Sequence, residues 1–263
     1  MPIHCPIVFP RLTEDEMRPL DFEVMRHAFA THKALGHLCD ESVYQAQLAH
    51  LLTAAGFQAE CEVPLTLTFR TFLKTLYLDL VVNRRAIYEL KTAAALTEAH
   101  FAQLLNYLFL ANAARGKLVN FRPSSVESRF VNSMLDDSER RRFRVADKQW
   151  RGPAEFRQMI EELVADWGTG LDQALYTQAI VHCLGGEEKV VQQVPMQLDG
   201  APLGHQRFHL ADAETAFRIT TFQEELGGTH QQQLRKLMAP SPLKKLYWVN
   251  IARHEVGLHS IDL

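Results

Sequence analysis

Residues 76–91 read LYLDLVVNRRAIYELK, and this stretch decides the fold. Two apolar, alternating segments flank the polar turn NRR, which is the pattern of two antiparallel strands joined by a tight turn. Because side chains alternate along a strand, Glu89 and Lys91 point to the same face. The short turn places Asp79 beside Glu89. The stretch therefore predicts two carboxylates and an amine gathered on one face of a sheet.

The surrounding sequence predicts helices and further strands. Apolar residues at helical spacing predict helices over residues 20–35, 41–54 and 97–113. Alternating residues predict strands at 62–69, 75–82, 86–91 and 117–121. Thr97 is a candidate helix N-cap. Three apolar residues of the first helix are expected in the core: Phe22, Met25 and Phe29.

The same order of elements recurs later in the chain. LGHLCDESVYQAQLAHLL at residues 35–52 aligns with WGTGLDQALYTQAIVHCL at 167–184. Three more pairs follow in the same order: EVPLTL with QVPMQL, AHFAQLLNYL with THQQQLRKLM, and LVNF with WVNI. The offset stays at 130 to 132 residues, which indicates an internal repeat.

We therefore expect an α/β protein made of two tandem units, each a small mixed sheet flanked by helices. The predicted boundaries are residues 1–134 and 153–263, with a charged, exposed connection at 135–152. The basic run within that connection is interpreted as a solvated linker rather than a nucleic-acid contact: Arg140, Arg141, Arg142 and Arg144.

Composition limits the class of partner and the compartment. A formal net charge of −3 argues against a generally basic coat, so a nucleic acid would be held by a local basic patch or through bound metal. The first residues carry neither a basic region nor a continuous apolar run, and no apolar run approaches the roughly 20 residues of a membrane helix. We expect no membrane association and a cytoplasmic protein.

The acidic pair and the lysine suit a hard divalent cation. Mg²⁺ or Mn²⁺ would be held by Asp79 and Glu89, with Glu41, early in its helix, completing the shell or holding a second ion. Such an ion activates water and polarises a phosphate, while Lys91 positions the water and offsets charge on the phosphate. Two alternatives remain open. In the first, Asp79 and Lys91 form a purely structural ion pair. In the second, Glu41 only interacts favourably with the dipole of its helix.

The helix predicted at residues 97–113 adds candidate substrate contacts. Gln103 and Tyr107 lie four residues apart and share one helical face. His100 lies one turn before them. Amide and phenol groups above an acidic site suit phosphate or base contacts, and the alternative is that they cap or pack the helix.

These residues carry a resemblance to a known family. Segment 35–133 resembles the GxxExxY family of the PD-(D/E)XK nuclease superfamily, through DESVYQ, AECEVPL, LDLVV, YELKTAAALTEAHFAQLLNYL and GKLVNF. Gln103 and Tyr107 also resemble the QxxxY motif of RecB-like nucleases. The resemblance implies a helix-flanked mixed sheet, Mg²⁺ dependence and hydrolysis of phosphodiester bonds in DNA or RNA. It extends to six residues: Glu41, Asp79, Glu89, Lys91, Gln103 and Tyr107.

Several features depart from relatives of this kind. The family's glycine three residues before Glu41 is Leu38 here, and Leu78 stands where the superfamily's name has proline. Some RecB-like nucleases hold an iron–sulfur cluster on four cysteines, three of them close together near the carboxyl end. That spacing is missing here, so the four cysteines are interpreted as structural or free thiols.

The second unit is expected to lack the metal site. At the constant offset, Asp79 aligns with Leu210, Glu89 with Thr220 and Lys91 with Phe222. A shift of one or two residues would substitute Asp212 or Glu224, yet no ExK motif survives. This unit is therefore expected to be catalytically inactive and to serve packing or substrate binding.

The leading hypothesis is a divalent-metal-dependent nuclease whose partner is nucleic acid, DNA rather than RNA. The alternative is a non-enzymatic nucleic-acid-binding or assembly module that keeps a nuclease fold. A third idea is that the two copies mimic a nuclease dimer, so that the chain is a monomeric pseudo-dimer.

Overall fold

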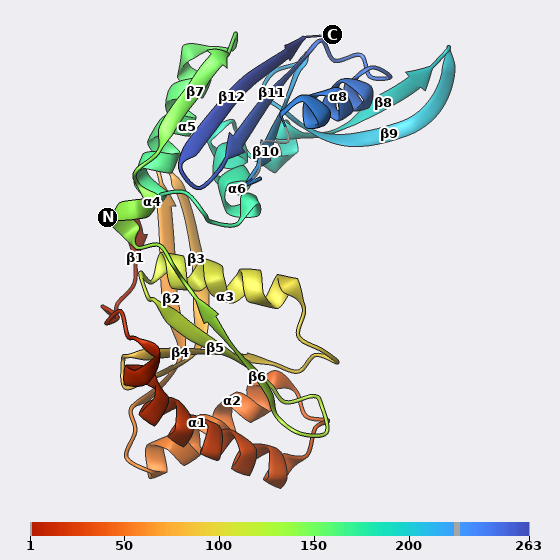
Figure 1. Ribbon diagram of the computed structural model, residues 1–263. Coiled ribbons are helices and arrows are strands. Elements are labelled where there is room, and N and C mark those ends of the chain that lie inside the picture. Colours follow the sequence, from red (N-terminus) through yellow and green to blue (C-terminus); the bar gives the residue numbers. More distant parts are fainter. Residues whose placement is uncertain (1, 224–226, 263) are drawn as a thin grey trace. The chain divides into compact units, whose positions relative to one another are not determined.

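The computed structural model of the protein describes residues 2–223 and 227–262 (Figure 1). The chain divides into two compact units. The first unit contains Met1–Thr68 and Leu73–Asp137, and the second contains Phe69–Phe72 and Ser138–Leu263. Each unit has its own six-stranded sheet.

In the first unit the strands lie in the order β1-β2-β3-β4-β5-β6. Strands β4 and β5 are parallel, whereas β3–β4 and β5–β6 are antiparallel, so the sheet is mixed. Its elements are β1 (Ile3–His4), α1 (Glu14–Leu35), α2 (Glu41–Ala54), β2 (Ala59–Phe69), β3 (Phe72–Val82), β4 (Ala86–Lys91), α3 (Glu98–Leu110), β5 (Arg115–Asn120) and β6 (Glu127–Asn132).

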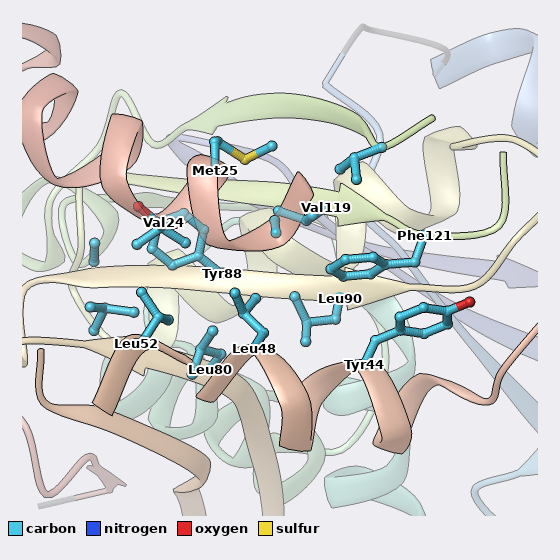
Figure 2. Packing of buried hydrophobic residues seen from close by; sticks show 14 of the residues in the cluster. Val24, Met25, Tyr44, Leu48, Leu52, Leu80, Tyr88, Leu90, Val119 and Phe121 are labelled. Atoms are coloured by element: carbon cyan, nitrogen blue, oxygen red, sulfur yellow. The ribbon is translucent and has the colours of Figure 1, made fainter. Parts of the chain in front are cut away.

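Helices cover both faces of this sheet. Helices α1 and α2 pack on one face, where apolar residues of both helices and of β3, β4 and β5 form one core cluster (Figure 2). Figure 2 shows the ring of Tyr44 against that of Phe121, with centroids 4.6 Å apart. Helix α3 packs on the other face, so closely that a Cβ added at Gly116 would lie 3.1 Å from side-chain atoms of Leu104 and Leu108. The face under α3 is also the face of Glu89 and Lys91.

Two predicted core residues of the first helix prove to be exposed. Helix α1 begins at Glu14, earlier than predicted, after a capping box formed by Thr13 and Glu16. The side chains of Phe22 and Phe29 are 68% and 49% exposed, whereas Met25 is buried as predicted. The buried face instead carries residues at helical spacing that include polar ones: Met17, Asp21, Val24, Met25, Ala28 and Thr31. The face of the helix that packs on the sheet is therefore partly polar. For this reason the pattern of apolar residues in the sequence does not indicate which face is buried.

The second unit repeats the order of strands β2 to β6 in its strands β8 to β12, but its sixth strand, β7, lies beside β12 at the opposite edge from that of β1. Its strands lie in the order β7-β12-β11-β10-β9-β8, with β10 and β11 parallel, as β4 and β5 are in the first unit. Its elements are β7 (Arg144–Gln149), α5 (Ala154–Trp167), α6 (Gln173–Cys183), α7 (Glu187–Val190), β8 (Val191–Leu198), β9 (Ala201–Leu210), β10 (Thr215–Thr220), α8 (Gly227–Met238), β11 (Lys245–Ile251) and β12 (Glu255–Asp262). The predicted fold class of two mixed sheets flanked by helices is confirmed.

The repeat extends to matching hydrogen bonds. Gly36 ends α1 and Gly168 ends α5, both with left-handed φ angles of 69° and 74° that suit glycine. The buried hydroxyl of Tyr44 donates to the Gly36 carbonyl over 2.8 Å, and that of Tyr176 donates to the Gly168 carbonyl over 2.6 Å. Each hydroxyl also accepts from a backbone amide of the loop between the two helices. One tyrosine thus fixes the same helix–helix turn in each unit.

The predicted exposed connection is wrong in part. This segment contains helix α4 (Asp137–Arg140) and strand β7, an edge strand of the second sheet. Arg140 is fully buried, and its guanidinium donates to the carbonyls of Trp167 and Thr169 over 2.6 and 2.7 Å. These carbonyls lie at the end of α5, where helix carbonyls lack partners within the helix. Arg140 is therefore a structural residue and not part of a solvated linker.

Two further expectations concern the whole chain. Within residues 2–223 and 227–262, no helix is both long and apolar enough to cross a bilayer. The cysteines are free thiols at four separate positions: Cys5, Cys39, Cys61 and Cys183.

Candidate metal centre

The ammonium of Lys91 lies among three carboxylates. Its Nζ atom is 2.7 Å from Glu89 Oε1, 3.8 Å from Asp79 Oδ2 and 4.0 Å from Glu41 Oε1. The acids come from β3, β4 and the first turn of α2, so three elements build the site. The structure thus brings together all four residues for which chemistry is predicted.

Glu89 is the most buried member of this group. Its side chain has no exposed surface, and its Oε2 atom has no hydrogen-bond partner among the described residues. Burial, reinforced by the negative charge of Asp79, raises the pKa of Glu89 to about 8, although Lys91 acts in the opposite direction. A buried carboxylate oxygen without a partner is costly, so a ligand for it is expected.

Asp79 faces Glu89 across the strand pair. Leu80 pairs with Tyr88, and the next step of this register sets Asp79 opposite Glu89. Asp79 Oδ2 accepts a hydrogen bond of 2.7 Å from the backbone amide of Leu90. Burial raises the pKa of Asp79 to about 6, against the lowering effects of Lys91 and the Leu90 amide.

Lys91 balances part of this negative charge. Burial alone would lower the pKa of Lys91, but the surrounding carboxylates, Glu89 foremost, outweigh burial and raise it. Lys91 is therefore the charged partner of the acidic group. Its closest contact is Glu89, not Asp79, which differs from the structural ion pair considered above.

The donor set fits a hard cation. Mg²⁺ and Mn²⁺ prefer carboxylate oxygens, and the unpartnered Glu89 Oε2 lies next to two further acids. In the described ranges, no three carboxylate, imidazole or thiolate side chains are already gathered as a metal-binding group. The ammonium of Lys91 stands among the acids instead, so an incoming cation would compete with it.

Asn120, the last residue of β5, and Arg122, just after the strand, hold the loops around this site. Asn120 accepts from the amide of Ala93 and donates to its carbonyl, over 3.1 and 2.8 Å. The guanidinium of Arg122 donates to the carbonyls of Thr92 and His37 over 3.2 and 2.9 Å. The loop after Lys91 is thereby tied to the loop that precedes Glu41.

The predicted substrate contacts divide into two groups. Gln103 donates from Nε2 to the hydroxyl of Tyr107 over 3.2 Å, on the face of α3 that covers the sheet. Burial raises the pKa of Tyr107 and the hydrogen bond with Gln103 lowers it, while the charges of Glu89 and Asp79 act to raise it. His100 instead accepts through Nδ1 from the amide of Thr97 over 3.1 Å and completes the capping of α3.

Sequence reasoning missed two residues beside Asp79. Gln45 donates from Nε2 to the backbone carbonyl of Asp79 over 2.6 Å and to Glu62 Oε1 over 2.8 Å. Glu62 is close enough for its charge to raise the pKa of Asp79. A signal existed, because Gln45 lies one helical turn after Glu41 and Glu62 lies in the quoted stretch AECEVPL.

The second unit places other residues at the equivalent positions. Asn250 contacts both backbone groups of Phe222 as Asn120 contacts those of Ala93, so the two asparagines correspond. Lys91 pairs with Asn120, and Thr220 pairs with Asn250. Thr220 is therefore the counterpart of Lys91, and the predicted Phe222 is wrong.

The same register corrects the other two counterparts. Glu89 corresponds to Arg218 rather than Thr220, because Leu118 and Trp248 are their strand partners. Asp79 corresponds to Phe208 rather than Leu210. On β9 and β10, Phe217 pairs with His209, so the next pair in this register is Arg218 with Phe208. Of the two acids considered as substitutes, Asp212 lies in the turn after β9 and Glu224 lies outside the described residues.

A helix-flanked mixed sheet with an acidic pair and a lysine on adjacent strands defines a nuclease-type α/β unit. The comparison with known families agrees. Residues 18–131 match the model of the PD-(D/E)XK nuclease superfamily, so most of the first unit is similar to a domain of this superfamily. Members of this superfamily generally hydrolyse phosphodiester bonds and typically use divalent metals. No curated protein matches the chain.

Proposed function

We propose that the first unit is a divalent-metal-dependent nuclease that hydrolyses phosphodiester bonds of DNA or RNA. The observation that carries this proposal is the Glu89 carboxylate, fully buried with one oxygen unpartnered among the described residues, next to Asp79 and Lys91. A group this costly is retained where it holds a ligand. The superfamily match at residues 18–131 supports the same activity.

Each residue has a task in this proposal. Asp79 and Glu89 would hold Mg²⁺ or Mn²⁺, and Glu41 would complete the shell from α2. The chemistry supplied by the bound cation is a lowered pKa of water and a polarised phosphodiester. Lys91, freed from Glu89, orients the attacking water and offsets negative charge on the phosphate.

The substrate contacts are assigned to α3 and the second unit. Gln103 and Tyr107 present an amide and a phenol near the acidic group, and His100 lies one turn earlier, at the start of α3. We assign the second unit a binding or packing role without catalysis, because Phe208, Arg218 and Thr220 stand where Asp79, Glu89 and Lys91 stand in the first. DNA is the favoured partner, and the two units in one chain would act as a monomeric pseudo-dimer in the cytoplasm.

A substrate panel tests the proposal. Single-stranded, duplex and branched DNA and RNA are incubated with wild type and Glu89→Ala protein in Mg²⁺, Mn²⁺ or Ca²⁺. We expect cleavage by wild type in Mg²⁺ or Mn²⁺ and none by the variant. Intact substrates in every wild-type reaction would remove the assignment as an enzyme. Light scattering of the same sample tests the monomeric state, which a tight homodimer would contradict.

One observation favours a second candidate function. Lys91 already neutralises part of the acidic group, so the unit is able to fold as a non-enzymatic nucleic-acid-binding or assembly module. Calorimetric titration separates the two functions. Mn²⁺ binding that disappears in Asp79→Ala supports the nuclease, and nucleic-acid binding without any metal binding supports the module.

A further inference from the structure

The side chain of Gln45 joins two acids on different strands. Both hydrogens of its amide nitrogen are used, one for the Asp79 carbonyl at 2.6 Å and one for Glu62 Oε1 at 2.8 Å. Gln45 lies on α2 one turn after Glu41, and Asp79 lies on β3. The contact therefore links the helix that carries one candidate ligand to the strand that carries another.

The backbone at Glu62 is arranged for this contact. Glu62 lies inside β2 with a φ angle of 51°, a left-handed conformation that non-glycine residues rarely adopt within a strand. Such an irregularity locally re-aims a side chain and is frequent next to active sites. Here the carboxylate that it aims is the one bound by Gln45.

Asp79 in turn orients the next strand. Its Oδ2 atom accepts from the amide of Leu90, the residue between Glu89 and Lys91. A chain of contacts thus runs from Glu62 through Gln45 and Asp79 to the centre of the ExK motif. Outer contacts of this kind fix the geometry of metal ligands.

We infer that Gln45 and Glu62 form a clamp that positions Asp79 in the candidate metal centre, with Gln45 in direct contact and Glu62 acting through it. Both are positioning residues. The inference deepens the proposed nuclease function and rests on it for the role of the metal, whereas the clamp itself is a property of the protein without metal.

Four variants of the full chain test the clamp. Gln45→Ala removes the donor, and Glu62→Gly removes the carboxylate while accepting the left-handed backbone, so it is expected to fold at least as stably as wild type. The double variant combines them. Gln47→Ala, a partly exposed glutamine of the same helix, is the matched control. Thermal unfolding checks that all four are folded.

The first readout needs no metal. Because the Leu90 amide donates to Asp79 Oδ2, its hydrogen-exchange rate reports the position of that carboxylate. We expect exchange of this amide to rise by about 10-fold or more in Gln45→Ala and Glu62→Gly, and to stay at the wild-type rate in Gln47→Ala. An unchanged rate in both clamp variants overturns the inference, whatever the protein does with metal.

The second readout is Mn²⁺ affinity by calorimetry. We expect each clamp variant to bind Mn²⁺ about 10-fold more weakly than wild type, as removal of an outer contact typically does. The double variant should lose no more Mn²⁺ affinity than the single variant with the larger loss, because the two residues act through one chain of contacts. Wild-type affinity in the clamp variants overturns the positioning role. If wild type binds no Mn²⁺ while Leu90 exchange still responds, the proposed nuclease function fails and the clamp stands.

Discussion

The ammonium of Lys91 lies 2.7 Å from Oε1 of Glu89, a carboxylate with no exposed surface. In the metal-free protein, Lys91 is thus the closest partner of the most buried acid of the site. The same lysine lies within 4.0 Å of Asp79 and Glu41, so one ammonium serves three acidic groups. The site is under-compensated, and a divalent cation would relieve this imbalance.

The first prediction concerns Lys91. Lys91→Met should abolish cleavage and also destabilise the metal-free first unit, because the buried Glu89 then loses its hydrogen-bond partner and Asp79 and Glu41 lose their nearby positive charge. We expect the free energy of unfolding of this unit to fall by about 2–4 kcal/mol. This is somewhat less than for breaking a fully buried ion pair, because the side chains of Asp79 and Glu41 are partly exposed to solvent. All three tryptophans lie in the second unit, so tryptophan fluorescence in urea follows that unit, and the part of the circular dichroism transition without a matching fluorescence change follows the first unit. Equal stability of variant and wild type would show that Lys91 does not compensate the acids.

The second prediction concerns pH. Glu89 keeps its proton in the folded protein up to about pH 8, whereas the unfolded chain releases it near the ordinary value of 4.5. The folded state binds more protons in this window, so the free energy of unfolding should fall as pH rises from about 4.5 to about 8. Asp79, whose pKa is raised to about 6, adds to the fall at the lower end. Urea unfolding in EDTA at several pH values measures this fall in the free energy of unfolding.

Glu89→Gln isolates the contribution of this one acid. We expect wild type to lose on the order of 3 kcal/mol across the window, at about 1.4 kcal/mol per pKa unit reduced by coupling to Lys91. The variant should lose less, with most of its loss complete by about pH 6, where Asp79 has titrated. Parallel curves for wild type and variant between pH 6 and pH 8 would contradict the raised pKa of Glu89. Mg²⁺ should flatten the wild-type curve only.

Much of the first unit is predictable from local pattern. Helix α2 and strand β4 have the predicted bounds, because Gly56 follows the end of the helix and the turn at residues 83–85 precedes the strand, along which side chains alternate between two faces. The placement of Asp79, Glu89 and Lys91 follows from that alternation together with one short turn. Their proximity is thus a short-range property, readable from sixteen consecutive residues.

The parts that were missed depend on long-range packing. The contact between Gln45 and Glu62 needs a left-handed residue inside β2, which no local pattern announces. Phe22 and Phe29 have the spacing of a core stripe, yet the sheet receives the neighbouring stripe, which contains Asp21. That choice is decided by a partner 96 residues away, Lys117, whose Nζ is 2.6 Å from Asp21 Oδ2.

The third prediction concerns this buried pair. Asp21→Ala leaves the ammonium of Lys117 buried, over the ring of Phe130 at 4.3 Å, without its carboxylate. We expect a loss of about 3–5 kcal/mol in the free energy of unfolding of the first unit. The double variant Asp21→Leu with Lys117→Met removes both charges and should recover most of the loss. A double variant no more stable than Asp21→Ala would show that the pair specifies the packing of α1 beyond its charges.

The last prediction concerns the two tyrosines that mark the repeat. Tyr44→Phe and Tyr176→Phe each leave a glycine carbonyl and a loop amide without their partner, so each should cost about 1–3 kcal/mol in its own unit. Tryptophan fluorescence reports the second unit, and the part of the circular dichroism transition that fluorescence does not follow reports the first. Tyr77→Phe, at a side chain 49% exposed, is the control and should be near neutral. Because the Tyr44 turn precedes Glu41, Tyr44→Phe should also weaken Mn²⁺ binding, whereas Tyr176→Phe should not. A loss of metal affinity in Tyr176→Phe alone would place the cation in the second unit, where Arg218 is the counterpart of Glu89, and would contradict the assignment of the metal centre to the first unit.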